Sequence, residues 1–394
     1  MDFGIFDADN HYYEAEDCFL RHADEKVKRH VRWLNDGKRR FMVFGRNIPV
    51  DIPNPTFNPV SKPGSLQGRL KELERGERPA AGGENWNELV PISPWYQDRD
   101  QRLMMMDEQG LERAFLFPTL GQSVETMVTD EPDLLYRCFR AFNDWVDDDW
   151  GFSRDNRIYA PPVIPMMDVN RAVVELDRVI ALGAKAVVLR SGPVYGRSPA
   201  DPYFDPFWSR MNEAGLVVLF HAIAGPTPYP DGFKAMWTRP ADDREYMATL
   251  QATLFPFERP AMDSLTALIL GNFFGRFPNV KVAVIEMGGS WVPYLMHSLD
   301  HAGGIAERRV TAFGVRLTEK PSEIFKQHVW VSPFPEEDVV ALTRAIGVEH
   351  VLMGSDWPHA EGTPTPSDYA QCLDGLDDSS IRKIMRENAL SLVS

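Results

Sequence analysis

The chain has 394 residues, of which 44% are hydrophobic and 25% charged, a balance typical of a globular protein with a sizeable core. Its formal net charge of -15 and its pI near 5.1 argue against nucleic acid or an anionic membrane as a partner. The three cysteines form no CxxC pair, so neither a disulfide framework nor a thiolate zinc site is expected. We find no signal peptide and no apolar run long enough to cross a bilayer, and therefore expect a soluble cytoplasmic protein.

Eight short β-rich apolar runs alternate with longer amphipathic stretches, such as DQRLMMMDEQGL before the second run and VNRAVVELDRVIALG after the third. Several runs lack polar alternation, which is typical of parallel strands that are buried on both faces. Eight βα units in succession predict an α/β fold of the (β/α)8 TIM-barrel type. A doubly wound open sheet is the alternative, although no GxGxxG follows the first strand. The predicted strands are residues 3–9, 113–119, 157–165, 184–192, 216–222, 281–289, 328–334 and 350–356.

Two stretches, residues 35–98 and 224–262, are too long for ordinary βα loops. Both follow predicted strands on the C-terminal side of the barrel, the face where barrel enzymes place their active sites. We expect them to be lids or pocket walls within a single domain spanning residues 1–394, or else contacts in a homo-oligomer such as a dimer. Their aromatic residues, including Trp95 and Phe257, suggest an apolar pocket or a small core inside each insertion.

Residues that can bind metal gather at the C-terminal ends of predicted strands. In FDADNHYY, Asp7, Asp9 and His11 alternate, so all three side chains would face the same side of a strand. The first, fifth, sixth and eighth strands all end at or near a histidine or an acid. One such acid could cap a helix, but a single convergent metal site explains all four better than four separate caps. The candidate ligands are Asp9, His11, His221, Glu286, Asp356 and His359.

These stretches resemble the amidohydrolase superfamily, specifically its amidohydrolase 2 branch of metal-dependent hydrolases and decarboxylases. The resemblance covers nearly the whole chain, from DADNH through MDEQGLERAFLFP and GLVVLFH to RENALSLV. Its most specific parts are FGRFPNVKVAVIEMGG and GSDWPH. It implies a (β/α)8 barrel that holds a divalent metal and acts on a small molecule.

Members of this family usually carry a His-x-His pair on strand 1, a histidine on each of strands 5 and 6, and an aspartate on strand 8. Here the pair becomes Asp9 and His11, and strand 6 offers Glu286 in place of a histidine. His221 and Asp356 match the pattern. Two positions therefore depart from it, both towards a carboxylate.

These departures change the number of metal ions to expect. Asp9, Glu286 and Asp356 would bring three anions together, a charge that two divalent ions would nearly balance. We consider a dinuclear site, with Glu286 as the bridge and His359 as an extra ligand, and equally a mononuclear site in which one of these two is a general base. The mixed nitrogen and oxygen ligands suit Fe, Zn or Mn. No carbamylated lysine is available as a bridge, because Arg190 ends strand 4.

The sequence favours a hydrolase, in which a metal-activated water attacks the carbonyl of an amide, ester, thioester or activated C–C bond. Asp356 would take the proton of this water and pass it to the leaving group, with His359 as a second candidate for proton transfer. Arg190 would hold a substrate carboxylate or phosphate, or else pair with a neighbouring acid. Asp7 is expected to orient a ligand rather than to bind metal.

Three other functions stay open. The first is non-oxidative decarboxylation of an aromatic or unsaturated acid, which in this family leans on the strand-6 histidine and ranks second because Glu286 stands there. The second is oxygen-dependent chemistry at a di-metal site, which carboxylate-rich iron sites support. The third is a catalytically silent partner subunit, although the set of ligand-capable residues at the strand ends argues against it.

Overall fold

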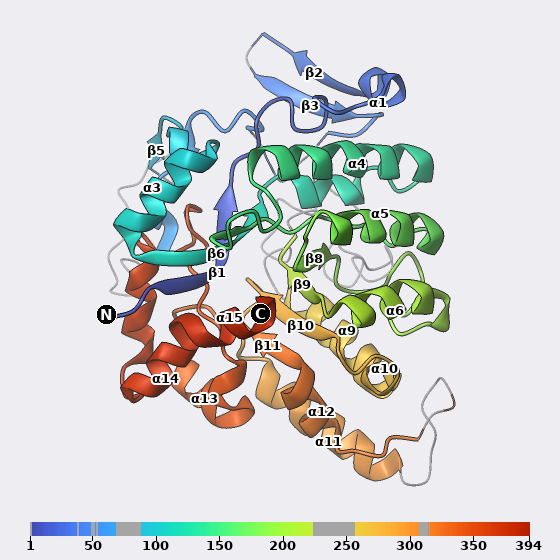
Figure 1. The fold of residues 1–394 in the computed structure, drawn as a ribbon, viewed down its shortest axis with the longest axis vertical. Coiled ribbons are helices and arrows are strands. Elements are labelled where there is room, and N and C mark those ends of the chain that lie inside the picture. The colour runs from blue at the N-terminus through green and yellow to red at the C-terminus, as the bar shows by residue number, and fades with distance from the viewer. Residues whose placement is uncertain are drawn as a thin grey trace, which may run out of the picture.

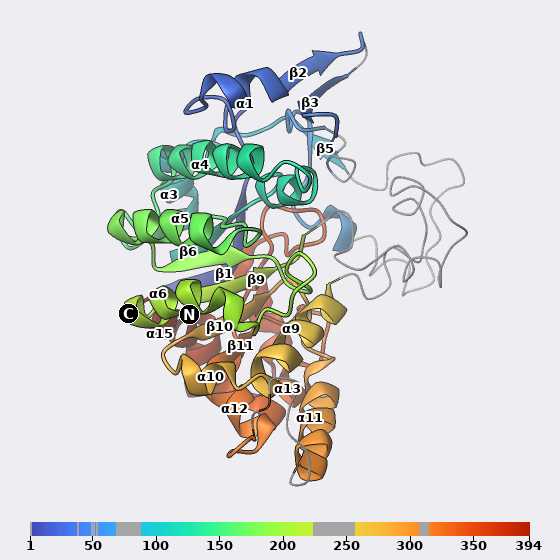
Figure 2. The ribbon, with the colours of Figure 1, turned by 90° about the vertical axis from the view of Figure 1, so that its right-hand side faces the viewer.

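The computed structural model describes residues 2–37, 39–48, 52, 54–67, 88–223, 257–306, 314 and 316–394. Parallel strands occupy the interior and helices surround them (Figure 1). Figure 2 shows α4 (Pro132–Asp149), α5 (Val169–Ala181) and α6 (Asp205–Ala214) following one another in chain order along the outside of the strands. Among the described residues, no helix has both the length and the apolar character that crossing a membrane requires.

The parallel strands of the described chain form two sheets. In the first sheet, β1 pairs with β6, and β6 pairs with β7. In the second sheet, β8, β9, β10 and β11 pair in the order of the chain. The bounds are β1 Ile5–Tyr12, β6 Leu111–Pro118, β7 Ile158–Tyr159, β8 Ala186–Leu189, β9 Val217–His221, β10 Lys281–Ile285 and β11 Val329–Val331.

Backbone pairing joins the two sheets at both edges. At one edge, Val163 beyond β7 forms a parallel bridge with Val188 of β8. At the other edge, residues 351–357 lie between β11 and β1, bridging Val331 and accepting the backbone N–H of His11. The last predicted strand therefore occupies the eighth place of the ring, and the predicted (β/α)8 barrel is confirmed.

Two of the eight predicted strands are less regular than the sequence pattern indicates. The third is a strand only at Ile158–Tyr159, because Pro161 and Pro162 follow and have no N–H to donate to a ladder. The eighth, predicted at residues 350–356, has isolated bridges at Val351 and Trp357 instead of a continuous ladder. Its extended course is interrupted at Asp356, whose φ is 53°.

Capping residues visible in the sequence set the ends of several helices. The side chain of Asp98 accepts the N–H of Gln101 at the start of α3 (Arg99–Gln109), and Gly110 ends this helix with a φ of 73°. Asp168 caps α5 in the same way as Asp98 caps α3. The other α-helices of the described residues are α1 Glu25–His30, α9 Glu258–Leu270, α10 Phe273–Arg276, α11 Val292–Ala306, α12 Pro321–His328, α13 Val339–Ile346, α14 Asp378–Arg382 and α15 Asn388–Val393.

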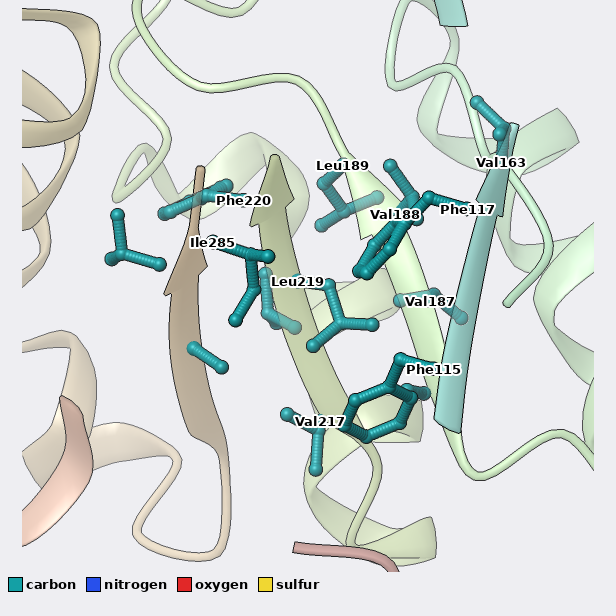
Figure 3. Packing of buried hydrophobic residues seen from close by; sticks show 14 of the residues in the cluster. Phe115, Phe117, Val163, Val187, Val188, Leu189, Val217, Leu219, Phe220 and Ile285 are labelled. Atoms are coloured by element: carbon teal, nitrogen blue, oxygen red, sulfur yellow. The ribbon is translucent and has the colours of Figure 1, made fainter. Parts of the chain in front are cut away.

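The inward faces of the strands pack into an apolar core. Figure 3 shows Phe115 and Phe117 of β6 beside Val187 of β8 and Leu219 of β9, and all four are buried. Phe117 also stacks on the imidazole of His221, with ring centroids 4.2 Å apart. The core therefore supports the polar residues at the C-terminal ends of the strands.

The predicted insertion at 35–98 contains parts of two small antiparallel pairs. Side chains from both pairs line the cavity above the barrel, which agrees with a role as a pocket wall. The other predicted insertion, 224–262, lies outside the described residues up to position 256. The strands of the two pairs are β2 Val31–Asn35 with β3 Arg40–Phe44, and β4 Val60–Ser61 with β5 Leu89–Val90.

Candidate metal centre

The six predicted ligands come together at the C-terminal ends of the strands. Asp9 and His11 alternate on β1, and His221 is the last residue of β9. Glu286 directly follows β10, and Asp356 lies in the segment beside β1. Donor atoms lie within 4.8 Å of one another in each of two groups, Asp9 with His11, His221 and Glu286, and His11 with Asp356 and His359.

The shortest distances in the first group join imidazole nitrogens to each other and to carboxylate oxygens. His221 Nε2 lies 3.2 Å from His11 Nε2 and 3.2 Å from Glu286 Oε2. Asp9 Oδ1 lies 3.3 Å from both imidazole nitrogens. Water has little access to this group, because His11 and His221 expose only 1% and 2% of their surface.

A hydrogen bond fixes which nitrogen of His221 presents a lone pair to the group. Its Nδ1 lies 2.7 Å from the carbonyl oxygen of Ala222, which can only accept, so Nδ1 carries the proton of the neutral imidazole. Nε2 then faces His11, Asp9 and Glu286 without a proton of its own. The other ring nitrogen of His11, Nδ1, is buried and has no hydrogen-bond partner among the described residues. Nitrogen and oxygen donors that converge in this way suit Zn, Fe or Mn. The residues therefore fit a divalent metal ion.

A third group of donors overlaps the first two and contains Glu361, which sequence reasoning missed. His359 Nδ1 lies 2.7 Å from Asp356 Oδ1, and Asp356 Oδ1 lies 3.4 Å from His11 Nε2. Donor atoms of Glu286, Asp356, His359 and Glu361 all lie within 4.8 Å of one another. Glu361 follows a loop rather than a strand, so only its place in the GSDWPHAEG stretch could have indicated it.

Two of the candidate ligands have a strained backbone. Glu286 and Asp356 have φ angles of 57° and 53°, in the left-handed region that side chains other than glycine rarely adopt. Ile285 pairs with His221, so regular alternation would turn Glu286 away from His221. The left-handed turn brings its carboxylate beside His221 instead. Such strain costs on the order of 1–3 kcal/mol per residue and concentrates at functional sites.

Burial and mutual repulsion shift the ionisation of the acids. The pKa of Glu286 is raised well above its usual value by burial and by the charge of Asp356. The pKa of Asp356 is likewise raised by burial and by the charge of Glu361. Burial alone would raise the pKa of Asp9 too, but hydrogen bonding to the two histidines lowers it below the usual value. A bound cation would favour the ionised form of all these acids.

The buried carboxylate of Asp7 connects β1 to the segment at Ser355 through hydrogen bonds. Its carboxylate accepts the N–H of Asp9 (3.1 Å), the side-chain amide of Asn10 (2.8 Å) and both the N–H and the hydroxyl of Ser355 (3.0 and 2.5 Å). Burial raises the pKa of Asp7 to about 7, although these hydrogen bonds oppose the rise. Among the described residues Asp7 belongs to neither donor group, which agrees with the predicted role of orienting a ligand.

A cavity of about 1150 Å³ lies over the donor groups. Phe57 and Val60 of the first insertion, together with Phe257 and Phe334, give it apolar walls. Arg190 is absent from the described residues that line this cavity. Its charge opposes the rise that burial causes in the pKa of Glu125.

Arg102 is a further residue that the sequence did not reveal. It is fully buried and donates to the carbonyls of His11 (2.7 Å) and Trp95 (2.6 Å) and to the side chain of Asn10. Burial lowers its pKa to about 9, which still leaves it charged near neutral pH. It therefore fixes the end of β1 through these hydrogen bonds. Nothing in a helical DQRLMMMDEQ pattern distinguishes such an arginine from a solvated one.

Comparison with known proteins agrees with this geometry. A family model described as amidohydrolase matches residues 86–393, which is more than half of the chain. A solved amidohydrolase of Mycobacterium avium subsp. paratuberculosis K-10 is 38% identical, with a TM-score of 0.87 and complete coverage of both chains.

Two further relatives carry more specific descriptions. The 2-amino-3-carboxymuconate-6-semialdehyde decarboxylase of Dictyostelium discoideum is 23% identical over 233 residues, which cover 58% of this chain and 59% of that relative. A solved dihydroxybenzoic acid decarboxylase of Polaromonas sp. JS666, with bound manganese and the inhibitor 2-nitroresorcinol, is 16% identical over 99% of this chain and 97% of its own, with a TM-score of 0.61. At 16% identity, this likeness shows that the chain shares its fold with the decarboxylase of Polaromonas. The family match and the full-length structural relative establish that the chain belongs to the amidohydrolase family.

Proposed function

We propose that the protein is a metal-dependent enzyme that removes a carboxyl group from a small aromatic or unsaturated acid without an oxidant. The observation that carries the metal dependence is the buried pair of imidazole nitrogens, His11 Nε2 and His221 Nε2, 3.2 Å apart among carboxylate oxygens. Asp9, His11, His221 and Glu286 would hold the ion, with Asp356 at the edge of the group. When bound, a divalent ion such as Mn, Fe or Zn would supply Lewis acidity towards a substrate oxygen.

Decarboxylation breaks the bond between a carbon atom and its carboxyl group. The electron pair of that bond stays on the carbon, carbon dioxide leaves, and a proton must be delivered to the carbon. Asp356 and His359 both line the cavity and lie 2.7 Å apart, so this pair is placed to supply the proton and to be recharged from solvent. The apolar walls at Phe57 and Phe334 would pack against an aromatic or unsaturated body and keep water from it.

Decarboxylation ranks above hydrolysis in this proposal, whereas the sequence alone favours hydrolysis. The curated relative is a decarboxylase, and a decarboxylase is also among the proteins that share the fold. Glu286 in place of the usual strand-6 histidine is the observation that still favours hydrolysis. Its carboxylate, 3.2 Å from His221 Nε2, could act as a base towards water. A hydrolase of amides, esters or thioesters is therefore the second candidate.

The test is an assay of manganese-loaded protein on a panel of aromatic and unsaturated carboxylic acids, with amide, ester and thioester substrates alongside. Decarboxylation predicts one carbon dioxide for each product, and in D2O one deuterium on the carbon that lost the carboxyl group. Turnover should be the same with and without oxygen, whereas oxygen dependence would point to an oxygenase. Hydrolysis of the carbonyl substrates with no carbon dioxide from any acid would overturn the proposal in favour of the second candidate.

A further inference from the structure

Gln122 brings a buried amide group to the wall of the cavity that lies over the donor groups. Its side chain lines that cavity, and the residue is only 3% exposed. The amide nitrogen, Nε2, carries two N–H groups, and neither meets an acceptor among the residues that the structure describes. Buried polar groups are nearly always hydrogen-bonded, because burial removes the water that would otherwise bind them. A buried donor without a partner at a cavity wall therefore indicates a ligand that supplies the acceptor.

The segment that carries Gln122 begins beside the candidate metal ligands. Gln122 belongs to η2 (Gly121–Thr126), a short 3-10 helix that follows β6. Two residues before this helix, Thr119 Oγ1 donates to the carbonyl of Tyr12 (2.8 Å) and lies 3.1 Å from His359 Nε2. Gln122 and His359 line the same cavity. A molecule bound at the donor groups can therefore also reach the amide of Gln122.

The start of η2 is held firmly in place. Glu14 Oε1 accepts the N–H groups of Leu120 (2.8 Å) and Gly121 (2.7 Å). Gly121 also packs against the ring of Phe142 so closely that no room is left for a Cβ. An amide on a segment fixed in this way gives up little freedom when it binds a ligand, so it can discriminate well between ligands.

The chemistry of the cavity limits what this ligand group can be. An N–H group only donates, so the atom that Nε2 binds must be an acceptor. An aromatic or unsaturated hydrocarbon body would pack against Phe57 and Phe334, but it offers no acceptor. The carboxyl group that reacts is assigned to the donor groups in the proposed function. The acceptor for Gln122 is therefore a second oxygen group on the substrate.

We propose that Gln122 selects substrates with a second oxygen group, a hydroxyl or a second carboxylate, on the body that bears the reacting carboxyl group. This inference deepens the proposed function and rests on an acid as its substrate. An acid without the second group would leave the buried amide unpaired, and it should bind at least about tenfold more weakly. Sites built to hydrogen-bond one polar group reject analogues that lack it for the same reason.

Equilibrium binding to the manganese-loaded full chain measures this selectivity without turnover. The probes are benzoate, two acids that add a hydroxyl (salicylate and meta-hydroxybenzoate) and two that add a carboxylate (phthalate and isophthalate), each titrated by calorimetry. The proposal predicts that at least one of the four substituted acids binds at least about tenfold more tightly than benzoate. No such advantage for any of the four would overturn it.

Substitutions assign the selectivity to the amide of Gln122. Gln122→Met keeps the length of the side chain but removes both N–H groups, so the advantage over benzoate should disappear. Gln371→Met is the matched control, because Gln371 donates to Asp368 at the surface and is not among the described residues that line the cavity. This control should keep the advantage. An unchanged ratio of affinities in Gln122→Met would contradict the proposal.

Gln122→Glu distinguishes the two sources of the second oxygen. Its carboxylate can accept from a hydroxyl group but repels a second carboxylate. A preference for hydroxybenzoates should therefore survive in part, whereas a preference for dicarboxylates should be lost. Full retention of a preference for dicarboxylates would show that Gln122 does not contact the second group.

The ratio of affinities is the readout, because partial unfolding of a variant would weaken the binding of all the acids alike. Decarboxylation assays on the same preparations separate this inference from the proposed function. Decarboxylation with equal binding of benzoate and the substituted acids refutes only the role of Gln122. Selectivity that depends on Gln122, without release of carbon dioxide from any tested acid, refutes only the proposed reaction.

Discussion

His11 and His221 are 210 positions apart in the chain, and yet their Nε2 atoms lie 3.2 Å from each other at the ends of β1 and β9. The hydrogen bond from His221 Nδ1 to Ala222 directs the lone pair of His221 Nε2 into this contact. A proton on His11 Nε2 or a cation next to both nitrogens makes such a contact favourable in a buried site. Because carboxylate oxygens of Asp9 and Glu286 also lie beside His221 Nε2, we infer a metal ion here, and this relationship sets the first prediction.

His221→Asn should abolish stabilisation of the fold by metal. The asparagine can keep a donor near the Ala222 carbonyl but offers no imidazole nitrogen to the ion. A metal at a concentration 100 times its Kd stabilises the wild-type protein by about 2.7 kcal/mol, which thermal unfolding with and without Mn²⁺ should detect. His22→Asn is the control, because His22 pairs with Asp148 at the surface and should leave the shift intact.

Gly354→Ala should displace Asp9 from the site. A Cβ at Gly354 would lie 2.7 Å from Asp9 Cβ and 2.3 Å from Ser332 Oγ, so the segment that pairs with β1 would have to move. We expect weaker metal binding and a loss of about 1–3 kcal/mol of unfolding free energy. Gly304→Ala in α11 has open space around it and should be neutral or slightly stabilising. Equal metal affinity in the two variants would show that the close approach at Gly354 does not position Asp9.

The sequence predicted the ligands that follow buried strands. His221 and Glu286 were readable because a continuous apolar run ends at each of them, and parallel strands bring such ends to one face. Glu361 was not readable, because its approach to Glu286 depends on how the loop after the eighth strand folds back. Arg190 also ends a predicted strand, and its charge lowers the pKa of Glu125, an effect that nothing in the sequence specifies.

Arg102→Met should destabilise the protein by about 3 kcal/mol, because carbonyl groups that now accept from a buried charge would lose their donors. Denaturant unfolding at pH 7 measures the loss. Arg140→Met is the control, since Arg140 is about half exposed in its pair with Asp144 and should change stability by less than about 1 kcal/mol. If the two variants proved equally stable, the end of β1 would not depend on Arg102.

Glu14→Gln should remove a pH-dependent part of the stability. Burial raises the pKa of Glu14 from 4.5 to about 7, against the backbone N–H groups that lower it. The folded protein then holds this proton more tightly than the unfolded chain. The contribution is fully present below pH 4.5 and is lost as the pH rises through 7, by about 3 kcal/mol in total.

Urea unfolding between pH 4.5 and 8 tests this difference. The wild-type protein should lose more stability over that range than Glu14→Gln, which cannot titrate. Glu25→Gln, at a position where the side chain is 79% exposed, should follow the wild-type curve. Parallel curves for wild type and Glu14→Gln would mean that the pKa of Glu14 is not raised in the folded protein.

The barrel fold was predictable from the sequence, but the roles of the buried polar residues were not. Strands buried on both faces appear in the sequence as apolar runs, and their number and order specify the barrel. Arg102, Glu14 and Thr119 act through hydrogen bonds to backbone groups of β1 and the loop after β6. Such contacts depend on tertiary packing, which local sequence patterns do not encode.

The most direct test of the metal centre is anomalous diffraction at the zinc absorption edge from crystals of the zinc-loaded protein. The geometry predicts an anomalous peak about 2.1 Å from the Nε2 atoms of both His11 and His221. No peak between these two nitrogens in protein saturated with zinc, or peaks only at surface acids, would contradict the account.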